Sequence, residues 1–200
     1  MKKIILFLFL IFTLNSFSQK SEEYVKFSEE IKRNSKSDKN DKTVFDLLND
    51  FYEQVLQSDN GELNQNTIRK IEELYADHNA KNLQILSLFL AYQEHISETV
   101  STGRKPNIDL QLDLLNDLEN ELKEVYNKVP VIVIIYKAEA LNSAGQSQKY
   151  SELLKQSLIE FPDSVPLKVY SYLDTKNEEL KLNLIKKHSN HWMLKQFQIK

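Results

Sequence analysis

The 200-residue sequence contains no cysteine, and this absence removes several classes of site at once. Without a thiol the chain forms no disulfide framework, offers no thiolate to zinc and has no cysteine nucleophile. A lipoprotein anchor, which is attached to a cysteine, is excluded as well. The folded protein therefore depends on its hydrophobic core alone.

Glycine and proline are scarce, with only three and four residues in the whole chain. Each glycine falls at a break in the apolar periodicity, at Gly61, Gly103 and Gly145. A β-sandwich of this length needs a turn signal about every 8–12 residues, and such signals are missing. Few breakers between long periodic segments predict an all-α fold.

Long apolar runs are also missing, with one exception at the start of the chain. Two lysines precede the apolar run Ile4–Leu14, and Ser16 and Ser18 place small residues three and one positions before Gln19. This layout is typical of a cleaved secretory signal, and the run is too short for a bilayer core of about 30 Å. We therefore expect residues 1–18 to be a signal peptide. Its removal leaves an exported protein, periplasmic or extracellular, without a membrane span.

A basic block is absent from the rest of the chain. Removal of the two lysines of the signal lowers the net charge from −3 to −5. Nucleic acids and anionic membrane surfaces attract basic proteins, so neither is expected to be the main partner.

The remaining chain divides into a short N-terminal region and one larger domain. Residues 19–42 are predicted to form a short helix over Ser21–Ile31 and then a polar linker, solvated or disordered, over Arg33–Lys42. The segment Ile108–Val129 alternates like a strand at its start but keeps helical apolar spacing over its length, which favours a helix. Residues 43–200 are predicted to form about four helix pairs, beginning with helices over Thr43–Gln57, Thr67–Asp77, Leu83–Val100 and Ile108–Val129.

The second half of the chain resembles itself. SELLKQSLIEFPDS at Ser151–Ser164 aligns without gaps on NEELKLNLIKKHSN at Asn177–Asn190, and a weaker copy covers Asn120–Pro130. In addition, Tyr136 precedes Tyr170 by 34 residues. Self-similarity at this period indicates stacked supersecondary units, none of which can bury its apolar face alone.

The stretch VPVIVIIY, from Val129 to Tyr136, is rich in β-branched residues and reads locally as a strand. Its context favours a helix, because Pro130 suits the first helical position and helical segments lie on both sides. Apolar residues on every side of that helix indicate that neighbours surround it. Burial of each side chain, worth about 1.5–3 kcal/mol, outweighs the helix propensity cost of a few tenths of a kcal/mol.

One unit has family features. Val131–Ser164 is 34 residues long, with Gly145 after the first helix and Pro162 after the second, seventeen residues later. Small and apolar packing positions are filled by Ala138, Leu141, Leu154 and Leu158, whereas the pattern is broken at Ile134, Tyr150 and Ser157. The unit resembles a tetratricopeptide repeat. The resemblance implies antiparallel helix pairs stacked as a short α-solenoid, and it implies binding of a protein or peptide.

In tetratricopeptide proteins the first helix of each pair lines the concave face. At the corresponding positions this unit has Ile132, Ile135, Glu139 and Asn142, with no basic residue, so the family's clamp for a terminal carboxylate is not carried over. These four residues and Trp192 are the candidate partner-binding residues. Two alternatives stay open: the apolar positions pack on the next helix of the same chain, and Trp192 belongs to a capping helix.

No catalytic residue, metal site or cofactor is predicted. His188 and His191 form an H-x-x-H pair, but two ligands are too few for a closed zinc site. His78 and His95 are interpreted as surface or cap residues. No G-x-S-x-G elbow occurs, and Ser101–Lys105 lacks the spacing of a phosphate-binding loop.

These patterns predict a non-catalytic scaffold or adaptor in the cell envelope that binds another protein. One alternative is an enzyme or small-ligand-binding protein with a pocket between helices. Another is a structural accessory subunit whose apolar faces are permanently covered in an envelope complex.

Overall fold

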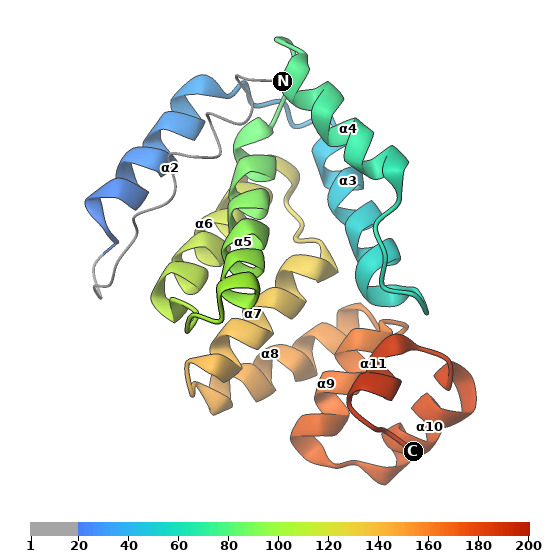
Figure 1. Ribbon diagram of the computed structural model, residues 1–200. Coiled ribbons are helices and arrows are strands. Elements are labelled where there is room, and N and C mark those ends of the chain that lie inside the picture. Colours follow the sequence, from blue (N-terminus) through green and yellow to red (C-terminus); the bar gives the residue numbers. More distant parts are fainter. Residues whose placement is uncertain (1–19) are drawn as a thin grey trace.

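The computed structural model describes residues 20–200, and the expected signal peptide over residues 1–18 lies outside them. In the described part of the chain the regular secondary structure is helical, apart from one isolated bridge between Lys36 and Lys81, and there is no strand. Its elements are α2 (Glu22–Asn34), α3 (Thr43–Phe51), the π-helix η2 (Tyr52–Gln57), α4 (Gln65–Ala76), α5 (Leu83–Thr102), α6 (Ile108–Tyr126), α7 (Val131–Ser143), α8 (Ser147–Glu160), α9 (Val165–Thr175), α10 (Glu178–His188) and α11 (Trp192–Gln196) (Figure 1).

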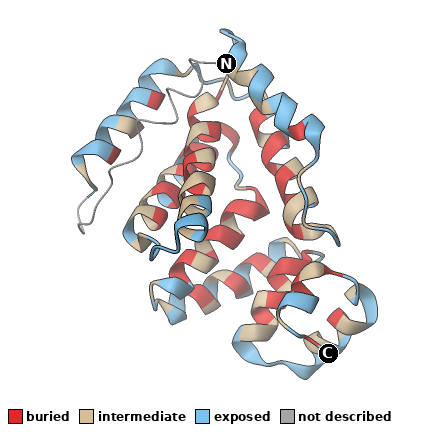
Figure 2. Cartoon of the chain, viewed as in Figure 1, coloured by how far each residue is buried: buried red, intermediate tan, exposed pale blue. Residues whose placement is uncertain are grey.

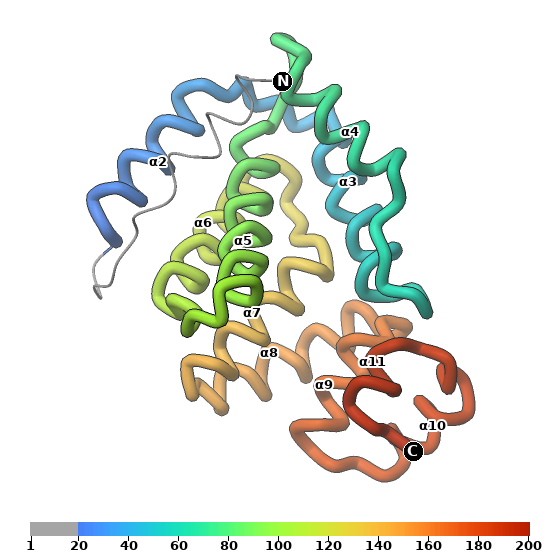
Figure 3. The backbone as a smooth tube through the Cα atoms, viewed as in Figure 1, coloured from blue at the N-terminus to red at the C-terminus, as the bar shows by residue number. Residues whose placement is uncertain are grey.

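The six helices from α5 to α10 form three successive antiparallel pairs. From α5 to α10 each helix packs against the next one along the chain, as stacked pairs require (Figure 3). The all-α fold predicted from scarce turn signals is therefore confirmed. Within residues 20–200 no helix combines the length and the apolar character needed to cross a membrane.

Helix α7 contains the β-branched stretch, and it is a helix as predicted. It begins at Val131, with Pro130 in an extended conformation directly before it. Val131, Ile132 and Val133 are all buried, so three adjacent faces of this helix are covered by protein. Burial on most sides of the helix thus overrides the local strand propensity.

Helix α3 and η2 cover the first helix of each pair. Helix α3 packs on α5 and α7, and η2 packs on α7 and α9. The contact is aromatic at its centre, where the ring of Phe51 lies edge-on to Phe89 with centroids 5.0 Å apart. Phe89 in turn stacks on Tyr136 of α7. The chain's own helices α3 and η2 therefore cover the face of the first helices on which the resemblance to tetratricopeptide repeats predicts partner binding.

The segment between α2 and α3 is non-helical and mostly exposed to solvent, as expected for a polar linker, but hydrogen bonds also attach it to the start of α5. The side-chain Oδ1 of Asn82 accepts a hydrogen bond from the backbone N–H of Asp38 at 2.9 Å. Its Nδ2 donates to the carbonyl oxygens of Asp38 and Asp41 and to the hydroxyl of Tyr126. A fully buried side chain at the start of α5 thus holds the segment in place.

The core consists of two clusters. The larger one extends from α2 to α9, and the smaller one joins α9, α10 and α11 through residues such as Val169, Leu184 and Met193. Figure 2 shows buried residues concentrated on the inner sides of α3, α5 and α7, whereas α4 is mostly exposed. The C-terminal helices therefore have a small core of their own beside the main one.

Candidate functional site

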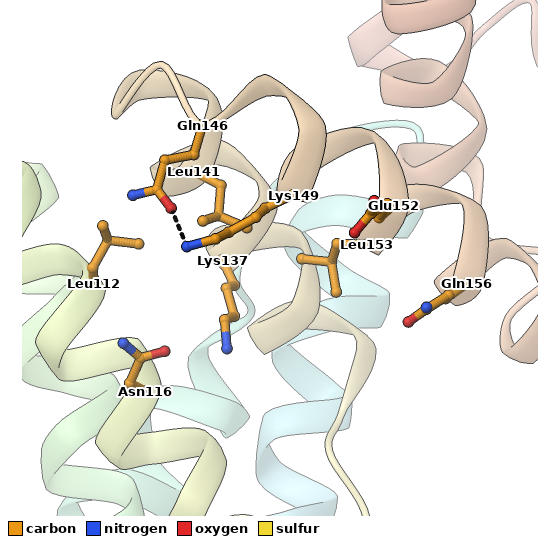
Figure 4. Close-up of a pocket in the computed structure, with 9 residues that line it drawn as sticks. All are labelled: Leu112, Asn116, Lys137, Leu141, Gln146, Lys149, Glu152, Leu153 and Gln156. Atoms are coloured by element: carbon orange, nitrogen blue, oxygen red, sulfur yellow. Dashed lines mark hydrogen bonds between the residues drawn. The ribbon is translucent and has the colours of Figure 1, made fainter.

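A groove of about 430 Å³ opens between α6, α7 and α8, and we call it the α6–α8 groove. It lies beside the second helices of the first two pairs, whereas α3 and η2 cover the first helices. Its aliphatic residues come from all three helices: Leu112, Leu141 and Leu153 (Figure 4). The polar lining residues are Asn116, Lys137, Gln146, Lys149, Glu152 and Gln156.

The polar lining is rich in hydrogen-bonding groups that face solvent. Asn116 and Gln156 are exposed, and Gln146 is half-buried at the turn between α7 and α8. A carboxamide both donates and accepts, so it can pair with either group of a peptide backbone. With three aliphatic and six polar residues, the lining is more polar than that of a usual small-molecule pocket.

Lysines dominate the charge around the groove. Lys137 and Lys123 both bind the Glu119 carboxylate. Burial of the Glu119 carboxyl opposes ionisation, but the hydrogen bonds from Lys123 and Lys137 lower its pKa overall. The ammonium group of Lys149 donates instead to the neutral Oε1 of Gln146, at 2.8 Å (Figure 4). Lys123 and Lys137 therefore share one carboxylate, whereas Lys149 is bound to a neutral side-chain amide.

The structure separates the four residues predicted on the inner face of α7. Ile132 and Ile135 are completely buried in the main core, so a partner cannot reach them in this conformation. For these two residues the alternative applies, because helices of the same chain cover them. Asn142 is exposed near the end of α7. Of the four residues, only Glu139 has a titratable side chain.

Glu139 lies among tyrosines from four helices. The hydroxyl of Tyr170, on α9, donates a hydrogen bond to its carboxylate. Burial raises the pKa of Glu139, and this hydrogen bond partly offsets the rise. Burial and the nearby Asp174 and Glu139 carboxylates raise the pKa of Tyr150, on α8, to about 12. Tyr92 and Tyr136 stack on each other with centroids 5.1 Å apart, and the Glu139 carboxylate adds to the effect of burial in raising both of their pKa values.

Trp192, the fifth candidate residue, starts α11 and is half-buried between the two core clusters. Its indole ring packs against Gly61 in the loop after η2, so closely that a Cβ added to Gly61 would lie 3.2 Å from Nε1. Much of the ring is therefore engaged within the chain. This position agrees with the capping interpretation more than with an exposed anchor.

The histidines have structural surroundings. His188 ends α10, and His191 caps α11, where its Nδ1 accepts the backbone N–H of Met193. Burial lowers the pKa of both side chains. His95 accepts the backbone N–H of Asn107 through Nε2. Among residues 20–200 no three His, Asp or Glu side chains are grouped in a way that could hold a metal ion.

Sequence reasoning missed both the groove and the tyrosine cluster. The groove combines side chains that are up to 44 positions apart, from Leu112 to Gln156, and none of them forms a short motif. The one usable signal for the cluster was the 34-residue spacing of Tyr136 and Tyr170, since equivalent positions in neighbouring repeats lie side by side. Comparison of the chain with family models, curated proteins and solved structures gives no match.

Proposed function

We propose that this protein is an exported, non-catalytic helical-repeat protein that acts as an adaptor in the cell envelope. In this proposal it binds an extended segment of another protein in the α6–α8 groove. The observation that carries the proposal is the groove itself: aliphatic residues from three helices, bordered by carboxamides and lysines that face solvent. The resemblance of Val131–Ser164 to a tetratricopeptide repeat supports the same class of function.

In this proposal the partner does not bind the inner face of the first helices, because α3 and η2 already cover that face. Helix α3 and η2 contact the first helices of all three pairs, and their apolar side chains belong to the main core. A partner that used this face would have to displace them, at the cost of the apolar area they bury. The α6–α8 groove needs no such opening.

The carboxamides favour an extended segment over a helix as the bound form. An extended chain offers backbone N–H and C=O groups along its length, whereas a helix uses these groups internally. Asn116, Gln146 and Gln156 stand at separate places along the groove and can pair with such groups. The aliphatic residues between them would receive a side chain of the segment.

A specific observation also favours a second candidate function, binding of a small ligand. Glu139 has a raised pKa and tyrosines from four helices around it, and such groups often mark functional sites. The hydroxyl of Tyr170 already binds the Glu139 carboxylate, however, and among residues 20–200 no nucleophile or second acid is hydrogen-bonded to it. This arrangement ranks below the groove.

The test is photocrosslinking inside cells. A photoreactive phenylalanine analogue replaces Gln156, which lines the groove, or Gln148, an exposed glutamine of the same helix that does not. One discrete adduct with another protein from position 156, absent from position 148, is the expected result. Equal adducts at both positions, or none at either, would reject the groove as the binding site.

A further inference from the structure

The charges around the α6–α8 groove are unbalanced in favour of cations. The Glu119 carboxylate forms ion pairs with both Lys123 and Lys137, whereas Lys149 forms no ion pair among the described residues. The lining itself contains one carboxylate, on Glu152, and this group accepts a hydrogen bond from Gln148. An added carboxylate near Lys149 would therefore meet an unpaired cation.

We propose that the segment bound in this groove carries an acidic side chain close to a large aliphatic one, and that Lys149 binds the acidic group. This inference rests on the function proposed above. The aliphatic side chain would lie among Leu112, Leu141 and Leu153, and the carboxylate would replace Gln146 as the acceptor for the Lys149 ammonium. A bond to a charged acceptor is stronger than a bond to a neutral amide, so the exchange favours binding.

The position of Lys149 suits this role. Its side chain is exposed and points toward Gln146, to which a dashed line joins its ammonium group in Figure 4. Lys137, by contrast, is already paired with Glu119 and is only half-exposed. A partner carboxylate at Lys137 would have to compete with a resident one, whereas at Lys149 it displaces only an amide.

The experiment selects random peptides of twelve residues, displayed on phage, against the purified protein. Selected peptides are then measured by fluorescence anisotropy against the wild type and against Lys149→Glu. The matched control is Lys155→Glu, which reverses another exposed lysine of α8 that does not line the groove. A groove-blocking variant, Leu153→Arg, reports whether the peptides bind there, and unchanged circular dichroism and melting temperature confirm that each variant is folded.

The expected result has three parts. The selected peptides contain Asp or Glu near Leu, Ile or Phe, and Lys149→Glu weakens their binding about fivefold whereas Lys155→Glu does not. Exchange of the peptide's acidic residue for Lys restores affinity for Lys149→Glu. Added salt weakens binding to the wild type, because the contact is an exposed ion pair.

Two other outcomes overturn different claims. If Leu153→Arg abolishes binding but the peptides show no acidic preference, or Lys149→Glu binds them as the wild type does, the role of Lys149 is rejected and the groove stands. If no selected peptide depends on Leu153, the groove itself is not a peptide site, and the proposed function fails together with this inference.

Discussion

The hydroxyl of Tyr170 on α9 donates a hydrogen bond to the carboxylate of Glu139 on α7 and so joins two neighbouring repeats. Tyr170 also touches Phe197, beyond α11, with ring centroids 6.1 Å apart. A single side chain therefore connects the Glu139 cluster to the small C-terminal core. Because Glu139 lies among apolar and aromatic groups, the protonation of its carboxyl is coupled to the stability of the fold.

We expect Glu139→Gln to change the pH dependence of stability. Burial raises the pKa of Glu139 in the folded state above its unfolded value. The carboxyl therefore contributes most to the stability of the fold at a pH below its unfolded pKa. This contribution to stability is lost as the pH rises through the folded pKa. Glutamine stays neutral, so the free energy of unfolding of the variant should rise relative to the wild type over that window. Urea unfolding between pH 4 and 8 measures the difference, with the exposed Glu160→Gln as a control for loss of a surface charge.

Tyr170→Phe tests the same contact from the other side. The variant keeps the ring but removes the donor, which leaves the Glu139 carboxylate without this partner. The free energy of unfolding should fall by about 1–3 kcal/mol at neutral pH. The loss should shrink in the Glu139→Gln background, where the acceptor is uncharged. Additive effects of the two substitutions would mean that the hydroxyl and the carboxylate do not interact.

Gly61 and Trp192 allow a test with an optical readout. Gly61 has φ +71°, and an added Cβ would press on the indole ring, so Gly61→Ala meets both backbone strain and a steric contact. Gly145→Ala is the matched control, because Gly145 has φ +70° but no atom within 4 Å of the added Cβ. Both variants should lose about 1 kcal/mol from the left-handed backbone, and Gly61→Ala should lose more.

Trp192 is the single tryptophan, so its fluorescence reports the contact directly. Gly61→Ala should shift the emission to longer wavelength as the ring moves toward water, and Gly145→Ala should leave it unchanged. Identical spectra in both variants would show that the ring does not depend on Gly61.

Helices were predicted correctly where helical apolar spacing continued over many residues, or where apolar residues on every side indicated a buried helix. The ambiguous segment now seen as α6 is a helix from Ile108 to Tyr126, and α7 is a helix despite its β-branched residues. The first follows from helical apolar spacing that continues over the whole segment, and the second from apolar residues on every side, which indicate that neighbours surround the helix. The π-helical turn over Tyr52–Gln57 was not predicted, because its residues have ordinary helical spacing.

The arrangement of the helices in space was beyond the sequence. Apolar faces on α3 and α7 show that each needs a cover, but not that they cover each other. For the same reason Ile132 and Ile135 were candidates for a partner until α3 and η2 were seen on that side. The Glu139 cluster depends on such contacts too, since each of its four helices supplies only one or two residues.

The aligned copies at Ser151–Ser164 and Asn177–Asn190 predict equal roles for aligned residues, and the structure separates them. Leu154 is only 1% exposed whereas its aligned Leu180 is half-buried, and Leu158 is half-buried whereas its aligned Leu184 is completely buried. Ile159 is 78% exposed whereas its aligned Ile185 is half-buried. Substitution by alanine should therefore cost about 2–5 kcal/mol at Leu154, less at Leu158 and almost nothing at Ile159. Thermal or urea unfolding gives the ranking. A loss below about 0.5 kcal/mol at both leucines would contradict the packing of α8.

Asn82 provides the sharpest test of how the segment between α2 and α3, expected to be a solvated or disordered linker, is held. Its backbone is left-handed, with φ 60°, and its side chain holds Asp38, Asp41 and Tyr126 through hydrogen bonds of 2.8–3.1 Å. Asn82→Gly keeps the favoured backbone but removes every side-chain bond, so the free energy of unfolding should fall by more than about 2 kcal/mol. Asn127 is the control, since it has φ 55° and is exposed, and Asn127→Gly should be nearly neutral. Hydrogen exchange at the Asp38 amide, which Asn82 binds in the wild type, should accelerate in Asn82→Gly and stay unchanged in Asn127→Gly. An unchanged Asp38 amide in both variants would mean that other contacts hold this segment.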